Sequence, residues 1–363
     1  MAWLGFAAGI CLLAITWSSV VKTLLIPRNM RSLITTVVAR SVLTGYRLAV
    51  SRISDMTRRE DALAAGPSVF LVSLLICWIA FLYVAYALML LPFANSSPVT
   101  ALRLSGSSIF TLGFAVPAGP GPYVITFVAA LSGIAVIALM IGYMPTLYSA
   151  YSRRETLVTM LEALSGAPPW GPELLARQRL VGNVAYLDRL YERWAEWAAD
   201  ISESHTTYRT LIYFRSRKPL QAWPLALLAV LDAAALHQAL CPDSAPREAR
   251  PLLRIGYSAM RSVAATLGVP VNEDPHPDDP LVLTRDEFDA AVRHLADAGW
   301  TFDRQPDDAW PHFRGWRVNY ETAAYNVAAH LDLPPAPWSG ARARLGAVAP
   351  MPQRPVNREP GSR

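Results

Sequence analysis

Residues 105–114 read SGSSIFTLGF, a small, polar and aromatic stretch between two long apolar segments. Ser97 and Pro98 form a typical helix start, because a serine hydroxyl caps the first turn and proline needs no N–H partner at the first helical position. A helix from 98 to about 109 has roughly three turns and is too short to cross a bilayer. The run VPAGPGP then leads to the next apolar segment. The sequence therefore predicts a re-entrant loop over residues 95–122.

Such a loop could bind a cation through its backbone. Irregular backbone at membrane depth is tolerated only where protein buries it or where it lines a water-filled path. A half-helix that enters the membrane directs its negative C-terminal end inward, which favours a cation there. The carbonyls of a short extended segment can replace the hydration shell of that cation. The interruption at 110–114 is therefore a candidate cation-binding element.

The elements that must position this loop are apolar helices. Crossing a bilayer takes roughly 20 apolar residues, and three segments are long enough: 1–26, 67–93 and 123–151. Between residues 62 and 152 the only charged side chain is that of Arg103. We expect an all-α membrane protein with an N-terminal transmembrane helix (1–27), a basic cytoplasmic linker (28–66) and a transmembrane helix pair around the pore loop (67–152).

The basic residues predict the orientation of these helices. Arg153 and Arg154 follow the third segment, and the linker holds Arg28, Arg31, Arg40, Arg47, Arg52, Arg58 and Arg59. Both basic flanks should be cytoplasmic, which places the N-terminus and the 94–122 loop outside. The chain has only two lysines, Lys22 and Lys218, and this arginine bias is typical of a GC-rich bacterial genome. We therefore expect a protein of the bacterial inner membrane, in contact with the lipid bilayer.

Apolar residues of the linker recur at helical spacing with arginines between them: Leu33, Ile34, Val37, Val38, Val42 and Leu43. A helix that lies on the inner membrane surface fits this pattern. A cytosolic amphipathic helix packed on the C-terminal domain fits it equally well.

Helix, short pore helix, filter and helix form the unit of the tetrameric potassium-type (pore-loop) cation channels, whose filter reads Thr-x-x-Thr-x-Gly-Tyr/Phe-Gly-Asp. Residues 108–116, SIFTLGFAV, resemble that filter, and residues 67–154 resemble a divergent two-helix-plus-pore member. The resemblance implies a homotetramer that conducts monovalent cations such as potassium. It further implies support from the pore-helix residues Ser107 and Ser108, and an ion path lined by the carbonyls of Thr111, Leu112, Gly113 and Phe114.

The sequence departs from the family pattern at two filter positions. Ala115 stands where the family has its second glycine, and Val116 stands where it has aspartate. The outer mouth therefore has no carboxylate to concentrate cations, and the ion selectivity stays open. Gly133, Gly142 and Pro145 are hinge candidates in the inner helix; packing between helices is the alternative role for the glycines.

Residues 153–333 predict a helical cytosolic domain, rich in tryptophan. Its helices are expected at 152–164, 172–204, 219–240, 246–267, 285–299 and 318–331, with Thr284 and Glu287 forming a capping box at the start of the helix 285–299. The 219–240 segment is apolar but contains Asp232, so we interpret it as a buried helix and not as a fourth span. The Pro/Ala/Arg-rich tail, 334–363, is expected to be disordered.

We find no catalytic constellation and expect no enzyme. Glu203 and His205 have no third ligand at metal spacing, and Cys11, Cys77 and Cys241 are too scattered for a metal site or a disulfide framework. We expect no cofactor beyond a bound monovalent cation. The arginines behind the net charge of +5 are not gathered on one helix with interleaved aromatics, so no nucleic-acid partner is expected.

The sequence thus favours a channel-like membrane protein with a cytosolic domain for assembly or gating. Two alternatives come from other classes. The first is a non-conducting membrane-anchored scaffold or sensor, in which the loop only packs. The second is a membrane-bound enzyme that uses residues 151–333.

Overall fold

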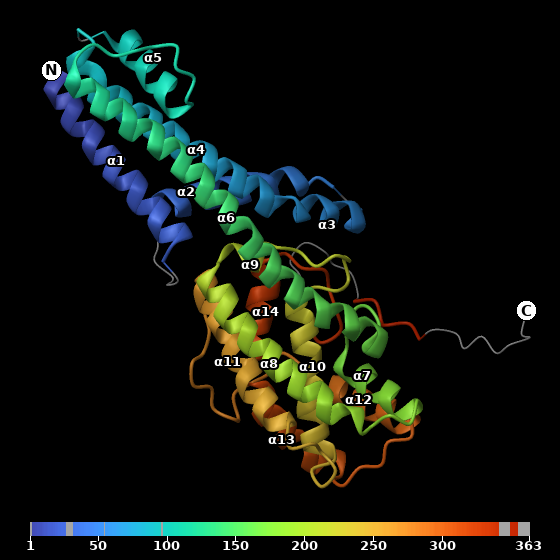
Figure 1. Cartoon of the computed structure of the whole chain (residues 1–363). Coiled ribbons are helices and arrows are strands. Elements are labelled where there is room, and N and C mark those ends of the chain that lie inside the picture. Colours follow the sequence, from blue (N-terminus) through green and yellow to red (C-terminus); the bar gives the residue numbers. More distant parts are fainter. Residues whose placement is uncertain (1, 27–31, 54, 96, 341–348, 355–363) are drawn as a thin grey trace, which may run out of the picture. The chain divides into compact units, whose positions relative to one another are not determined.

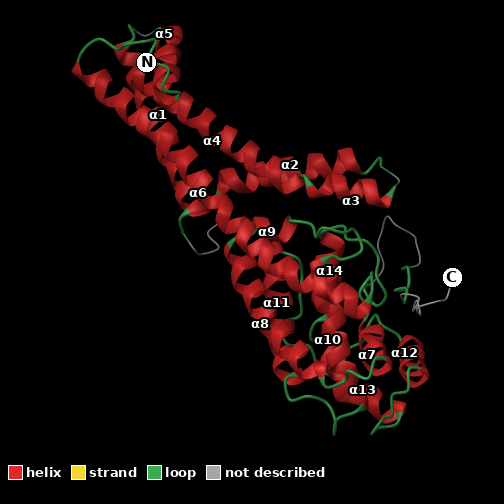
Figure 2. Cartoon of the chain, turned by 45° about the vertical axis from the view of Figure 1, so that its right-hand side comes forward, coloured by secondary structure: helices red, strands yellow, loops and turns green. Residues whose placement is uncertain are grey.

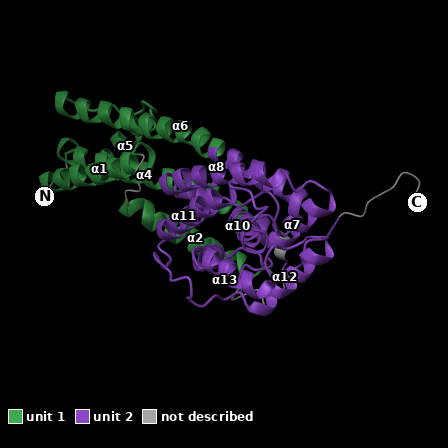
Figure 3. Ribbon diagram, turned by 90° about the horizontal axis from the view of Figure 1, so that it is seen from below, with its two compact units in different colours: residues 1–54, 62–149 green, residues 55–61, 150–363 purple. Residues whose placement is uncertain are grey.

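The structure is a computed structural model that describes residues 2–26, 32–53, 55–95, 97–340 and 349–354. Every regular element in these ranges is a helix (Figures 1 and 2). The chain forms two compact units, coloured separately in Figure 3: unit 1 contains Met1–Ser54 and Ala62–Ser149, and unit 2 contains Asp55–Asp61 and Ala150–Arg363. The chain passes between the units inside two helices, α3 (Met56–Ala64) and α6 (Pro120–Ser165). The all-α prediction is confirmed for the described residues.

In unit 1, α1 (Ala2–Leu24) and α4 (Gly66–Leu90) pack as antiparallel neighbours. A Cβ added at Gly9 would lie 2.7 Å from the Ala85 carbonyl oxygen, so this glycine lets the two helices approach closely. Farther along, the Trp78 indole N–H donates to the Ser19 hydroxyl over 3.0 Å. Close backbone approach and a buried polar contact are the usual means of holding helices together in lipid, where apolar burial drives little association.

The part of α6 in unit 1 runs antiparallel to α4, with which it shares polar contacts. The Tyr86 hydroxyl lies 2.7 Å from Ser132 Oγ and donates to the Val128 carbonyl over 3.4 Å. By length and composition α1, α4 and α6 are all able to cross a membrane. A membrane-compatible helix set is therefore present, with α1 starting, α4 ending and α6 starting at the same end of the bundle (Figure 1).

The linker helix α2 (Leu33–Val50) belongs to unit 1 and packs against α1 and α4. The Ser32 hydroxyl caps α2 and donates to Ser19 Oγ over 2.6 Å. At the other end of α2 the Tyr46 hydroxyl donates to the Ala62 carbonyl over 2.9 Å. By length and hydropathy alone α2 would also qualify as a membrane span.

Unit 2 is built around α10 (Trp223–Leu240), in which every residue except Gln238 is buried. Five helices pack against α10: α7 (Gly171–Leu180), α8 (Tyr186–Thr207), α11 (Ala249–Leu267), α13 (Pro306–Arg317) and α14 (Glu321–His330). A helix covered by protein on all sides can be apolar all round without meeting lipid. The interpretation of this segment as a buried helix is confirmed.

Asp232 is tolerated inside α10 because its charge is paired. The fully buried Arg317 guanidinium donates to Asp232 Oδ1, and the Tyr320 hydroxyl donates to the same oxygen over 2.9 Å. Arg317 also donates to Glu321 Oε1 over 2.9 Å and to the Trp338 carbonyl over 2.8 Å. A buried charge pair is stable only when the remaining donors and acceptors are satisfied as they are here.

The helices of unit 2 differ from the prediction in several places, among them the short helix α9 (Thr210–Tyr213), which was not predicted. The expected helix 172–204 is split into α7 and α8, because the intervening turn contains Gly182 in the left-handed region with φ of 66°. The helix α13 was not predicted, since Pro306 and Pro311 argue against a helix, yet Pro306 occupies its first turn. The expected capping box at the start of α12 (Arg285–Asp297), made by Thr284 and Glu287, is confirmed.

The tail was predicted to be disordered from residue 334, but residues 334–340, although they form no helix, are mostly buried. Ala336 and Trp338 are buried in the core of unit 2, where the Trp338 ring packs against Trp170 and Phe313. Burial of a large aromatic ring outweighs the proline-rich composition of the segment. The ordered core therefore extends to about Gly340, while residues 341–348 and 355–363 lie outside the described ranges.

Candidate ion-pathway site

The expected pore helix is α5 (Pro98–Ile109), with the predicted bounds. Ser97 caps its first turn, with its hydroxyl accepting from the Thr100 N–H over 3.4 Å. The Ser105 hydroxyl donates to the Tyr83 carbonyl of α4 over 2.7 Å. Twelve residues give a helix of about 18 Å, roughly half of what a membrane span needs. The contact between Tyr83 and Ser105 has no local sequence signal, because it depends on how α4 and α5 meet.

The C-terminus of α5 ends in a Schellman motif. The Leu112 N–H donates to the Ser107 carbonyl over 2.8 Å, and the Thr111 N–H donates to the Ser108 carbonyl over 3.0 Å. Thr111 takes the left-handed position with φ of 53°, and Gly113 follows at 70°. Glycine usually occupies this position, and a β-branched residue there is strained. Such strain gathers at functional sites.

The two predicted support residues, Ser107 and Ser108, make different contacts. The buried Ser107 hydroxyl accepts from the Ala115 N–H over 3.0 Å and donates to the Ala115 carbonyl over 3.3 Å. This single side chain therefore ties the returning segment to the helix. The Ser108 hydroxyl instead donates to the Leu104 carbonyl of its own helix over 2.9 Å. Of these two serines only Ser107 supports the loop, and Ser108 makes a contact inside the helix.

In the loop after α5, most backbone N–H groups are hydrogen-bonded, whereas most carbonyl groups are not. The N–H groups of residues 110–113 donate to carbonyls of the α5 terminus, and the Ala115 N–H donates to Ser107. No described residue donates to the carbonyls of residues 111–114, and the Thr111 hydroxyl donates to the Phe110 carbonyl over 2.8 Å. The loop therefore presents an excess of free carbonyl oxygens, which is the electrostatic character that attracts a cation.

In the single chain this loop is open. Leu112 is 63% and Phe114 57% exposed, and an added Cβ at Gly113 would meet no atom within 4 Å. Val116, at the position of the family's aspartate, is also exposed, as is Arg103 on α5. Within the described residues no group of three His, Cys, Asp or Glu side chains could hold a metal ion. Any ion here would be bound by backbone oxygens.

The hinge candidates in α6 have different surroundings. An added Cβ at Gly133 would lie 2.3 Å from the Ile109 carbonyl oxygen, so the end of α5 rests directly on this glycine. Gly142 has no atom within 4 Å of its added Cβ. The helix continues through both glycines and through Pro145. Gly133 is thus a packing position that supports the loop.

Comparisons of the chain with protein-family models, with curated proteins and with solved structures found no match. The function is therefore inferred from the geometry of the chain itself.

Single substitutions of Gly133 and Gly142 test whether each glycine serves helix packing or acts as a hinge in α6. We expect Gly133→Ala to lower the stability by about 1–3 kcal/mol, because the methyl group must displace the Ile109 carbonyl. Gly142→Ala should be neutral or stabilising by up to about 1 kcal/mol, since alanine is the better helix former and space is open. Thermal unfolding in detergent measures both. Equal effects of the two substitutions would contradict a packing role for Gly133.

Proposed function

We propose that this chain forms a membrane pore that conducts monovalent cations, with the carbonyls of Thr111, Leu112, Gly113 and Phe114 lining the ion path. The observation that carries the proposal is the unequal use of backbone groups in the loop. The N–H groups of residues 110–113 and of Ala115 are bonded within the chain, whereas the carbonyls of residues 111–114 accept from no described residue. In a membrane those carbonyls need a partner. A cation is a suitable partner, because carbonyl oxygens can coordinate it directly.

The electrostatics of the loop support a cation through backbone dipoles. The α5 terminus places the negative end of a helix dipole next to residues 111–114. No acidic residue occurs between 62 and 152, so attraction rests on backbone dipoles and not on a carboxylate ring. The family pattern implies potassium, but Ala115 and Val116 change the outer half of the filter. The Ala115 N–H and carbonyl are both bonded to Ser107, so Ala115 belongs to the support of the loop.

A tetramer is part of the same proposal. One chain supplies one strand of carbonyls, and surrounding an ion takes several strands about a symmetry axis. The exposure of residues 110–114 and of Val116 in the single chain is consistent with neighbours at that axis. Unit 2 would serve as an assembly or gating domain, because α6 runs from the pore module into it without a break.

The membrane orientation follows from the placement of charge. We propose an inner-membrane protein with the N-terminus and the 94–122 loop outside and unit 2 in the cytoplasm. In unit 1 the end of the bundle where α1 begins carries no basic residue except Arg103, and the α2 linker at the other end carries Arg40, Arg47 and Arg52. Positive loops stay on the cytoplasmic side.

A non-conducting membrane scaffold or sensor is the alternative. The observations that favour it are the ties of the loop to its own chain, namely the Ser107–Ala115 hydrogen bonds and the contact of α5 with Gly133. In that case the loop would be a packing element and its sequence would tolerate bulky changes.

Cation flux distinguishes the two functions. Gly113→Val should reduce flux to the level of empty liposomes while expression and oligomer size stay unchanged. Gly113 has φ of 70°, and a branched residue there would turn its carbonyl away from the ion path. Gly119→Val is a matched control, because Gly119 also has a positive φ, 92°, and open space, but lies outside the filter. The measurement is cation flux into liposomes with purified protein, and flux that survives Gly113→Val would favour the scaffold.

Assembly is tested by counting chains. We expect native mass spectrometry in mild detergent to give four copies, and cross-linking to give a ladder that stops at four. A monomer or dimer under all mild conditions would be incompatible with a carbonyl-lined pore.

Orientation is tested by labelling cysteines from outside the cell. In a background without Cys11 and Cys77, Ala118→Cys should react with a membrane-impermeant maleimide and Arg189→Cys should not. Both sites are exposed in the structure, whereas Cys241 is buried. Reaction at position 189 with protection at 118 would reverse the topology.

A further inference from the structure

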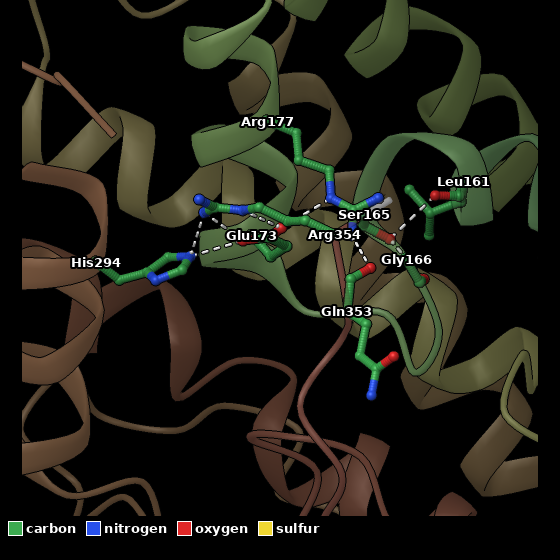
Figure 4. Close-up of polar contacts among 8 residues, drawn as sticks. All are labelled: Leu161, Ser165, Gly166, Glu173, Arg177, His294, Gln353 and Arg354. Carbon is green, nitrogen blue, oxygen red and sulfur yellow. Dashed lines mark hydrogen bonds and ion pairs between the residues drawn. The ribbon is translucent and has the colours of Figure 1, made fainter. Parts of the chain in front are cut away.

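A buried carboxylate in unit 2 is surrounded by nitrogen atoms of two arginines and a histidine. The Glu173 side chain, in the first turn of α7, is 2% exposed. Its carboxylate accepts from Arg177 Nε over 2.8 Å and lies 2.7 Å from His294 Nε2 (Figure 4). Burial raises the pKa of Glu173, but hydrogen bonds from His294, Arg354 and Arg177 outweigh it and lower the pKa to about 2. Glu173 is therefore ionised at neutral pH and suited to bind a cation.

The third donor comes from far along the chain. Arg354 donates from Nε and Nη2 to the two Glu173 oxygens, each over 2.8 Å, and Nη2 lies 3.2 Å from His294 Nε2. Two parallel hydrogen bonds between a guanidinium and a carboxylate give both strength and geometric selectivity. This geometry recognises arginine, because a lysine ammonium cannot make the planar two-point contact.

The neighbouring backbone is also bound. Arg177 Nη2 donates to the Gln353 carbonyl over 2.7 Å (Figure 4). At the end of α6, an added Cβ on Gly166 would lie 2.7 Å from Arg177 Nη2 and 2.9 Å from Pro352 Cβ. The absent side chain at Gly166 thus leaves room for both. We call Glu173, Arg177, His294 and Gly166 the Glu173 site.

The bound segment is held mainly by these polar contacts. Met351 is 54% exposed and the Arg354 side chain is 44% exposed, so the segment contributes little apolar burial. If it leaves, Glu173 keeps its hydrogen bonds to Arg177 and His294. No buried charge is then left unpaired, which removes the main cost of opening a buried ion pair. The Glu173 site can therefore exist both filled and empty.

We propose that the Glu173 site is a binding site for an arginine-bearing extended peptide, and that its resident occupant is the C-terminal segment 351–354 of the same chain. The segment acts as an exchangeable latch at the end of α6. All contacts of the Glu173 site lie within unit 2 and do not depend on ion conduction by unit 1.

The test uses a peptide that replaces the segment. The receptor is the full-length Arg354→Gln variant, whose own segment lacks the guanidinium. The probe is a fluorescent hexapeptide with the sequence of residues 349–354, Ala-Pro-Met-Pro-Gln-Arg, amidated at its C-terminus. We expect saturable binding by fluorescence anisotropy, and at least about tenfold weaker binding to the wild-type chain, where the resident segment competes.

Peptide variants and one protein variant provide the controls. Peptides with lysine or glutamine in place of the arginine should bind at least about tenfold more weakly. The double variant Arg354→Gln/Glu173→Gln should bind no arginine peptide. If that protein fails to fold, the three peptides on the Arg354→Gln chain still decide the question. Equal binding of the arginine and glutamine peptides, or no binding of the arginine peptide, would overturn the proposal.

Discussion

One constraint governs helices that are able to cross a membrane, such as those of unit 1, which is that backbone polar groups there must find partners within the protein. The segment that follows α5 meets this constraint for the N–H groups of residues 110–113 and Ala115 by folding back on the end of α5, where Ser107 accepts from both Leu112 and Ala115. The same fold-back leaves the carbonyls of residues 111–114 without a described donor. Other features serve this arrangement: Gly133 lets the helix end rest on α6, and Ser105 holds α5 to α4. The backbone, and not any side-chain constellation, gives the site its chemistry.

Unit 2 contains charged side chains that are buried in its core and bonded there to other groups. The sequence suggests Arg154 only as a marker of the cytoplasmic flank. In the structure its side chain is fully buried and donates to the carbonyls of Leu211, over 3.0 Å, and Phe214, over 2.8 Å. Its neighbour Arg153 is exposed and pairs with Asp200. Arg154 therefore anchors the part of α6 that belongs to unit 2, where desolvation without such partners would be costly.

Local signals predicted those features that depend on a few neighbouring residues. Ser97 and Pro98 gave the start of α5, and Thr284 with Glu287 gave the start of α12. The apolar pattern likewise predicted the long helices and the buried character of α10. These elements follow from capping and hydropathy, which act over one or two turns.

Features set by distant contacts were not predictable from the sequence. The composition of the segment around Trp338 indicates disorder. Trp338 nevertheless lies in the core, because its ring packs against Trp170 and Phe313. The spacing of Gly133 fits a hinge and a packing site equally, and only the position of Ile109 decides between them. The pairing of Glu173 with Arg354 joins residues 181 positions apart and has no local signature.

The central claim is that four chains bring the carbonyls of residues 111–114 to a common axis and that these oxygens bind a cation. The most direct measurement is a crystal structure of the assembled protein soaked in rubidium, with the ion located by its anomalous scattering. We predict anomalous peaks on the fourfold axis, at coordination distance from the carbonyl oxygens of Thr111, Leu112, Gly113 or Phe114. An assembly without peaks on its axis, with these carbonyls bonded to protein instead, would contradict the proposed pore.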